Sequence, residues 1–146
     1  MKLEPVKHYY KTHIEWTEEK KGILKSEEKP DIDVACPPEF GGHPNIWYPE
    51  DLFVGATEVC LMTTFIWYMT NEKIPFISYK SNAKGILELG NFNSRFSYIE
   101  IKINVCISSK NDVLKVKNIF EKLKQTCVIS NSIQTQVIIE PEINIC

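Results

Sequence analysis

Two cysteines, Cys60 and Cys127, lie far apart in the sequence, and each falls in an informative segment. Cys60 lies in the middle of a long apolar stretch, and Cys127 follows the apolar stripe of a second predicted helix. The thiolate is the nucleophilic form of cysteine. Two thiols that lie close together in a fold can form a reversible disulfide. The two positions therefore indicate a redox pair that only folding brings together.

The thiol of Cys60 needs help to ionise. It lies about 15 Å into its predicted helix, where the helix dipole has little effect. Apolar surroundings raise the pKa of a thiol. From the sequence alone we therefore expect that a nearby cation is required, because a buried cysteine without one is inert core.

The remaining cysteines and the histidines show no metal-ligand spacing, and no C-x-x-C pair occurs. We therefore expect neither a metal site nor a bound cofactor. Cys36 is predicted in the core of a sheet, Cys106 on a polar strand face and Cys146 at an exposed position, and none of them receives a role. The odd number of cysteines argues against a framework of extracellular disulfides.

The composition is that of a globular protein. The 146 residues have the size of one domain, and we expect residues 1–146 to form a single one. The formal net charge of -2 gives no electrostatic footprint for nucleic acid. The first residues form no apolar leader, and the longest apolar run, Val59–Met69, is too short to span a bilayer. We expect a cytoplasmic protein that binds neither nucleic acid nor membranes.

One long helix dominates the predicted fold. Pro49 suits the first helical position, Glu50 and Asp51 favour the first turn, and the helix extends to about Asn71. Because this helix is apolar on nearly every face, it must be covered on all sides. A small open sheet cannot do this alone, so the pattern predicts a dimer in which two central helices pack together under two sheets.

Alternation with a period of two residues predicts strands, and an apolar stripe predicts a second helix. The predicted strands are Val6–Trp16, Ile23–Lys25, Asp31–Cys36, Ile74–Lys80, Gly85–Leu89, Phe96–Ser108 and Thr135–Ile145. The second helix is expected to be capped by Asn111 or Asp112 and to end at about Thr126. This order, with mostly hairpin-length links, predicts an α+β fold with antiparallel sheets wrapped around the long central helix.

Three blocks of the sequence resemble the OsmC/organic hydroperoxide resistance family. The blocks are Pro37–Gly42 with Pro49–Leu52 leading to Cys60, then Arg95–Ile101, and finally Cys127–Ile133. The match spans roughly residues 10–140 in order. The resemblance implies a tightly intertwined homodimer that reduces peroxides, especially organic hydroperoxides. An external dithiol would recycle the enzyme.

The resemblance also implies roles for individual residues. Cys60 would be the peroxidatic thiol, Cys127 the resolving thiol, and Glu50 the acidic partner at the site. The best-characterised branch of the family has an arginine in the first β-turn beside the peroxidatic thiol, where this chain reads Lys20-Lys21-Gly22. Lys21 is therefore the first candidate for the cation, with Lys20 next. The alternative is that both are solvated turn lysines.

Glu50 and Cys60 cannot meet within one straight helix, because about 15 Å separates them along its axis. We therefore expect a site at the dimer interface, built from both chains. The alternative is that Glu50 only favours the helix N-terminus. The aromatic residues Phe53, Phe65, Trp47 and Trp67 are first of all expected in the core, although some could wall an apolar substrate pocket.

Two other functions stay open on the sequence. One is a non-catalytic dimer that binds a small apolar ligand in the same pocket, and the other is a redox sensor with slow turnover. The pKa of Cys60 separates the main candidates, because a lowered value favours catalysis and a raised value favours binding. The role of Glu58, within the apolar helix, stays open between pairing with a lysine and lining the site.

Overall fold

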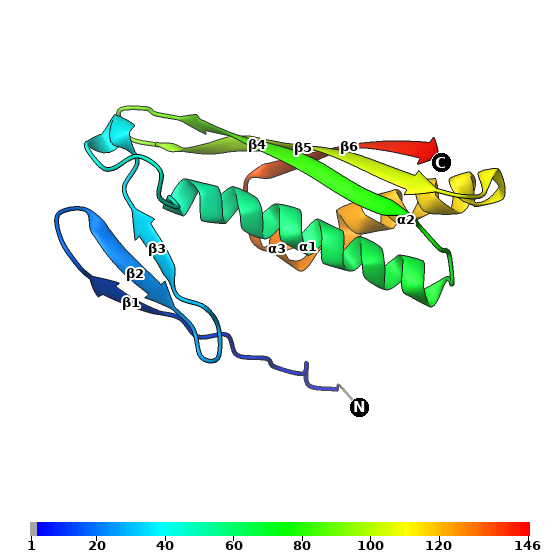
Figure 1. Cartoon of the computed structure of the whole chain (residues 1–146), viewed down its shortest axis with the longest axis horizontal. Coiled ribbons are helices and arrows are strands. Elements are labelled where there is room, and N and C mark those ends of the chain that lie inside the picture. The colour runs from blue at the N-terminus through cyan, green and yellow to red at the C-terminus, as the bar shows by residue number, and fades with distance from the viewer. Residues whose placement is uncertain (1–2) are drawn as a thin grey trace. The chain divides into compact units, whose positions relative to one another are not determined.

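The structure is a computed structural model that describes residues 3–146. The chain divides into two compact units, the first ending at Leu52 and the second comprising Phe53–Cys146 (Figure 1). The boundary falls within the first turn of the long helix α1, Pro49–Asn71. This helix has the bounds that the sequence predicts.

The first unit is built on a three-stranded antiparallel sheet. Its strands are β1 (His13–Trp16), β2 (Lys21–Lys25) and β3 (Ile32–Ala35), in that spatial order. The strand predicted from Val6 is therefore too long, because β2 offers partners only as far as His13, which pairs with Lys25. A 3-10 turn over Pro38–Phe40 follows.

The second unit contains a three-stranded sheet, three α-helices and a short 3-10 helix. Its elements after α1 are β4 (Ser78–Glu88), β5 (Arg95–Ile107), the 3-10 helix Lys110–Asp112, α2 (Val113–Thr126), α3 (Val128–Ser132) and β6 (Gln136–Ile145). The prediction of two short strands at Ile74–Lys80 and Gly85–Leu89 is wrong. The segment forms one strand because β5 is long enough to pair with all of it, from Cys106 opposite Ser78 to Arg95 opposite Glu88.

The pairing of β5 with β6 also departs from the antiparallel sheet that the sequence predicts. The two strands run parallel, with Tyr98 opposite Gln136 and Ile107 opposite Ile145. The reason is the connection, since α2 and α3 carry the chain back along the sheet before β6 begins. The order in the sheet is β4-β5-β6, so β6 is an edge strand.

The core of the second unit lies between the sheet and two helices, α1 and α2, which cover the same face of the sheet (Figure 1). Alternate residues of β5 point into this core, and the side chain of Phe65 lies at its centre. The Phe65 ring stacks on the ring of Phe120 in α2, with 5.2 Å between the ring centroids. It also packs against the ring of Tyr79, again with 5.2 Å between the centroids. The residues that α1 contributes to the interior are Thr57, Leu61, Phe65 and Met69.

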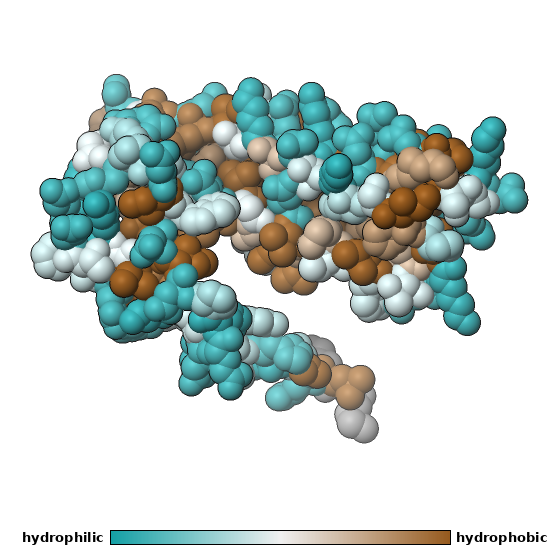
Figure 2. Space-filling model, in the orientation of Figure 1, coloured by the Kyte–Doolittle hydropathy of each residue, from teal (hydrophilic) through white to brown (hydrophobic). Residues whose placement is uncertain are grey.

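The opposite side of α1 is apolar but exposed. Val59 is 57% and Trp67 59% exposed, and Figure 2 shows apolar side chains at the surface over this helix. With 23 residues and a mean hydropathy of 1.4 in its most apolar stretch, α1 is long and apolar enough to cross a membrane. The expectation that the longest apolar run is too short to span a bilayer therefore does not hold for the whole helix. The core helix of a soluble protein has the same length and composition.

Candidate functional site

Cys60 and Cys127 come together inside the second unit. Cys60 lies half-buried on α1, and Cys127 is fully buried between α2 and α3. The backbone of Cys127 is extended, with φ -65° and ψ 112°, so this residue ends α2 and begins α3. Its N–H donates to the carbonyl of Leu123 at 3.1 Å, and its carbonyl accepts from the N–H of Asn131 at 3.0 Å. Both helices therefore fix the position of the Cys127 thiol.

The surroundings of Cys60 favour its thiolate. Burial raises the pKa of the Cys60 thiol, but several donors act against burial and hold the pKa below its ordinary value. The backbone N–H of Ile129 is the largest of these, followed by the Cys127 thiol, the Thr64 hydroxyl and the N–H of Val128. The two amides belong to the first turn of α3, where N–H groups have no partner within the helix.

Cys127 behaves in the opposite way. Burial raises the pKa of the Cys127 thiol, and the nearby Cys60 raises it further. The Ser130 hydroxyl donates to the Cys127 sulfur at 3.1 Å, and this bond together with the Ser130 N–H lowers the pKa only in part. The surroundings therefore favour a thiolate on Cys60 and oppose one on Cys127, and the neighbouring Cys127 thiol helps to lower the pKa of Cys60.

Three polar side chains of α1 and β4 lie close to this pair. The Ser81 hydroxyl donates to the carboxylate of Glu58, so Glu58 pairs with a serine and not with a lysine. The hydroxyl of Tyr79 is buried and has no hydrogen-bond partner within residues 3–146. Burial raises the pKa of Tyr79 to about 12, and the charge of Glu58 acts in the same direction. Tyr79 thus stays a neutral hydrogen-bond donor.

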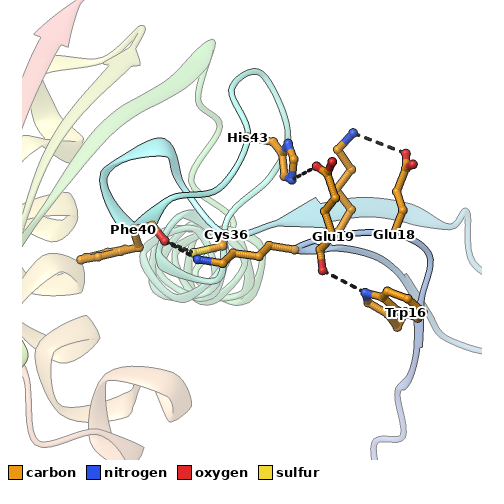
Figure 3. A network of polar contacts seen from close by, with 8 residues as sticks. Trp16, Glu18, Glu19, Cys36, Phe40 and His43 are labelled. Atoms are coloured by element: carbon orange, nitrogen blue, oxygen red, sulfur yellow. Dashed lines mark hydrogen bonds and ion pairs between the residues drawn. The ribbon is translucent and has the colours of Figure 1, made fainter.

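The predicted cation and carboxylate lie in the first unit. Lys21 Nζ forms an ion pair with Glu18 Oε1 at 3.6 Å, and Lys20 Nζ donates to the carbonyl of Phe40 at 2.7 Å (Figure 3). One carboxylate oxygen of Glu50 is buried without a hydrogen-bond partner in the part of the chain that the structure describes. The structure therefore joins the two cysteines within one unit, whereas Lys21 and Glu50 belong to the other.

Further polar contacts of the first unit lie in the hairpin between β1 and β2 and in the loop that contains Pro37–Gly42. The indole N–H of Trp16 donates to the carbonyl of Glu19 at 2.9 Å (Figure 3). His43 Nε2 approaches the carboxylate of Glu19 at 3.1 Å, and the Cys36 thiol donates to the carbonyl of Phe40 at 3.7 Å. The His43–Glu19 contact and the bond from Lys20 to Phe40 connect the hairpin between β1 and β2 to the loop that follows β3.

The aromatic residues divide between core and surface. Phe65 is core, and Phe53 packs against the ring of Phe96 at 5.0 Å. Trp47 and Trp67 are 57% and 59% exposed, so the expectation of a core position is wrong for both. Within residues 3–146 no group of three or more His, Cys, Asp or Glu side chains could hold a metal ion.

Sequence reasoning missed Thr64, Ser130 and the two amides. Ser130 lies in α3, and its hydroxyl donates to the Cys127 sulfur. A hydroxyl four residues after Cys60 on the same helix was the available signal for Thr64. The N–H groups of Val128 and Ile129 gave no signal, because any residue type except proline carries them.

The chain resembles known proteins over most of its length. The family described as OsmC-like protein matches residues 42–142. No curated protein matches the chain. Among solved structures, an OsmC-like protein of unknown function from Vibrio cholerae is 19% identical, with a TM-score of 0.85 over 93% of this chain and 100% of that one.

Two further structures show the same fold. An OsmC-like protein from Mycoplasma pneumoniae is 11% identical, with a TM-score of 0.82 over 95% of this chain and 99% of that one. An organic hydroperoxide resistance protein from Elizabethkingia anophelis is 19% identical, with a TM-score of 0.72 over 97% and 100%. Because the family match covers more than half of the sequence and the architecture agrees, the chain belongs to the family of OsmC-like proteins.

Proposed function

We propose that this protein is a cysteine-based peroxidase that reduces organic hydroperoxides, with Cys60 as the attacking thiol and Cys127 as the resolving thiol. The observation that carries the proposal is the pair of opposed environments. Cys60 has a lowered pKa and is half-buried, and Cys127 beside it has a raised pKa and is fully buried. A low-pKa thiol next to a second cysteine is the arrangement of a redox-active pair.

The activation of Cys60 does not depend on a cation in this account. The sequence alone suggested that a thiol this far along an apolar helix needs a positive side chain. Backbone N–H groups at the start of α3 supply the stabilisation instead. Hydrogen bonds to the charged form of a group lower the pKa of an acid. The lowered value favours catalysis over the non-catalytic ligand-binding alternative.

In the proposed reaction the Cys60 thiolate attacks an oxygen of the hydroperoxide ROOH, and the O–O bond breaks. The alkoxide takes up a proton and leaves as the alcohol ROH, while Cys60 becomes a sulfenic acid. The Cys127 sulfur then attacks the Cys60 sulfur, and water leaves as the disulfide forms. The two thiols have given two electrons to the peroxide, and an external dithiol returns them by thiol–disulfide exchange.

Lys21 and Glu50 have a separate proposed role, in orienting the peroxide. The ammonium group of Lys21 has one weak ion pair with an exposed carboxylate, which leaves it able to bind elsewhere. The unpartnered buried oxygen of Glu50 requires a donor that residues 3–146 of a single chain do not supply. A hydroperoxide O–H or a group of a second chain would satisfy it.

The exposed apolar side of α1 supports a homodimer. A large apolar patch that stays in water is costly, and each large apolar side chain removed from water stabilises an interface by about 1.5–3 kcal/mol. Val59, Ile66 and Trp67 share this side of α1 and are all exposed. We therefore propose that two copies of α1 pack together, which also brings residues of both chains toward the site.

The roles of the two cysteines make different predictions for single substitutions. We expect Cys60→Ser to abolish reduction of cumene hydroperoxide, because no thiolate remains at the site. We expect Cys127→Ser to form a sulfenic acid on Cys60 once, which dimedone would trap, and then to fail in dithiol-driven turnover. Cys36→Ser, outside the pair, is the control and should keep the rate. Full turnover by the Cys127→Ser variant would exclude Cys127 as the resolving thiol.

Removal of one amide donor tests the activation of Cys60. Val128→Pro deletes an N–H, and the fold tolerates it because Val128 is the first residue of α3 and Cys127 before it is already extended. We expect the pH midpoint for alkylation of Cys60 to lie below that of unfolded chain in the wild type. A lost donor destabilises the thiolate, so the midpoint should rise in Val128→Pro and not in Val128→Ala, which keeps the N–H. An equal midpoint in all three proteins would contradict amide activation.

Substitution of Lys21 separates binding from activation. We expect Lys21→Ala to lower kcat/KM for an organic hydroperoxide by roughly tenfold, the effect of about 1.4 kcal/mol in the transition state. The alkylation midpoint of Cys60 should stay in place. Lys25→Ala is the matched control, because Lys25 lies on the same strand and pairs with Glu15 at 3.1 Å. An unchanged kcat/KM in Lys21→Ala would rule the role out.

The dimer is tested by placing a charge on α1. We expect the wild type to sediment as a dimer and Trp67→Asp to sediment as a monomer, since a carboxylate in the interface would be desolvated. Leu114→Asp provides the control, because Leu114 is 69% exposed on a different helix. Analytical ultracentrifugation at micromolar concentration distinguishes the two states. A monomeric wild type with full peroxidase activity would end the idea of a shared site.

A further inference from the structure

The two cysteines that the proposed reaction does not use also lie side by side. In the parallel ladder of β5 and β6, Ile107 pairs with Ile145, and the N–H of the next residue, Cys146, donates to the Ile107 carbonyl at 3.0 Å. Cys146 thereby comes next to Cys106. Their α-carbons are 5.9 Å apart, and the structure joins their sulfurs as a disulfide. Disulfides usually span 4.4–6.8 Å between α-carbons.

The burial of Cys106 fits this pairing. The sequence placed Cys106 on the polar face of β5, and its neighbours on that face, Lys102 and Asn104, are indeed exposed. Cys106 itself is only 6% exposed, so the polar-face prediction is wrong for its exposure. The pairing of β5 with β6 explains the burial of Cys106, because it places Cys146, the residue after β6, beside the Cys106 thiol.

The segment that this bond would hold is weakly fixed otherwise. β6 is an edge strand with no fully buried residue, and Pro141 in its middle has no N–H to donate. After Pro141, Ile143 is the residue that packs against the core. A covalent link at position 146 therefore fastens the end of this edge strand to β5.

We propose that Cys106 and Cys146 form a second, reversible disulfide that fastens the end of β6 to β5, separately from the Cys60–Cys127 pair. The link also fixes one side of a cavity of about 420 Å³ between α2 and β6. Pro141 and Ile143 line that cavity from β6, opposite Val113 and Phe120 of α2. The redox state of the pair would set how firmly this side is held.

The oxidant is a low-molecular-weight disulfide, RSSR. Because Cys146 is exposed and Cys106 is buried, the reagent meets Cys146 first. The Cys146 thiolate attacks one sulfur, the RS–SR bond breaks, and one RSH leaves after taking up a proton. Cys106 then attacks the sulfur of Cys146 in the mixed disulfide and releases the second RSH. The protein has lost two electrons and two protons, and the two RSH molecules have gained them.

The experiment uses full-length Cys60→Ser protein, in which the Cys60–Cys127 disulfide cannot form, so its result does not depend on peroxidase activity. The fully reduced protein is treated with glutathione disulfide, and the linkages are mapped by mass spectrometry. We expect a Cys106–Cys146 bond and a Tm about 10 °C above that of the reduced form, since the bond closes a loop of 40 residues. Amide hydrogen exchange over residues 142–146 should slow at least tenfold.

Two further variants of this protein serve as controls. Cys60→Ser/Cys146→Ser should show neither the bond nor the rise in Tm, whereas Cys60→Ser/Cys36→Ser should show both. The inference is overturned if Cys146 stops at the glutathione mixed disulfide. It is also overturned if the bond forms but leaves the Tm and the exchange of residues 142–146 unchanged.

Discussion

The break in the backbone at Cys127 is the constraint on which the site depends. With an extended conformation at this residue, α2 ends and α3 begins at the same α-carbon. A continuous helix would use the N–H groups of Val128 and Ile129 in its own hydrogen-bond ladder. The interruption frees them, as at any helix start, and both lower the pKa of the Cys60 thiol. A single conformational feature thus buries the second thiol and provides donors that favour a thiolate on the first.

Each thiol then changes the pKa of the other: Cys127 lowers the pKa of Cys60, and Cys60 raises the pKa of Cys127. A thiolate on Cys60 accepts a hydrogen bond from the Cys127 thiol, which favours the charge on Cys60 and disfavours one on Cys127. In surroundings of low polarity two adjacent thiolates would repel strongly, so the first ionisation opposes the second. Ionisation is favoured at the half-buried thiol and opposed at the fully buried one. This division is what the proposed role of Cys60 as the attacking thiol requires.

Sequence patterns predicted the elements whose length and periodicity are strong. The bounds of α1, the long strand β5 and the inward position of Cys127 follow from apolar spacing, which tertiary packing reinforces. The errors concern strands whose length or direction is set by the neighbouring strand or by the connecting helices. The continuity of β4 depends on β5, and the direction of β6 depends on the helical connection. Amide donors for Cys60 were beyond sequence analysis, because the information lies in backbone geometry and not in residue type.

Activation by backbone amides has consequences that a charged side chain would not have. An amide N–H has a fixed direction, it does not titrate, and salt does not screen its short-range hydrogen bond as it screens a lysine charge. Formation of the thiolate is then a local property of the second unit, where α1 and α3 both belong. In the proposed reaction the side chains of Lys21 and Glu50 orient the peroxide, so orientation and ionisation would be supplied by different parts of the chain. On this proposal the Cys60 thiolate is favoured although the chain has lysines where the family arginine is expected.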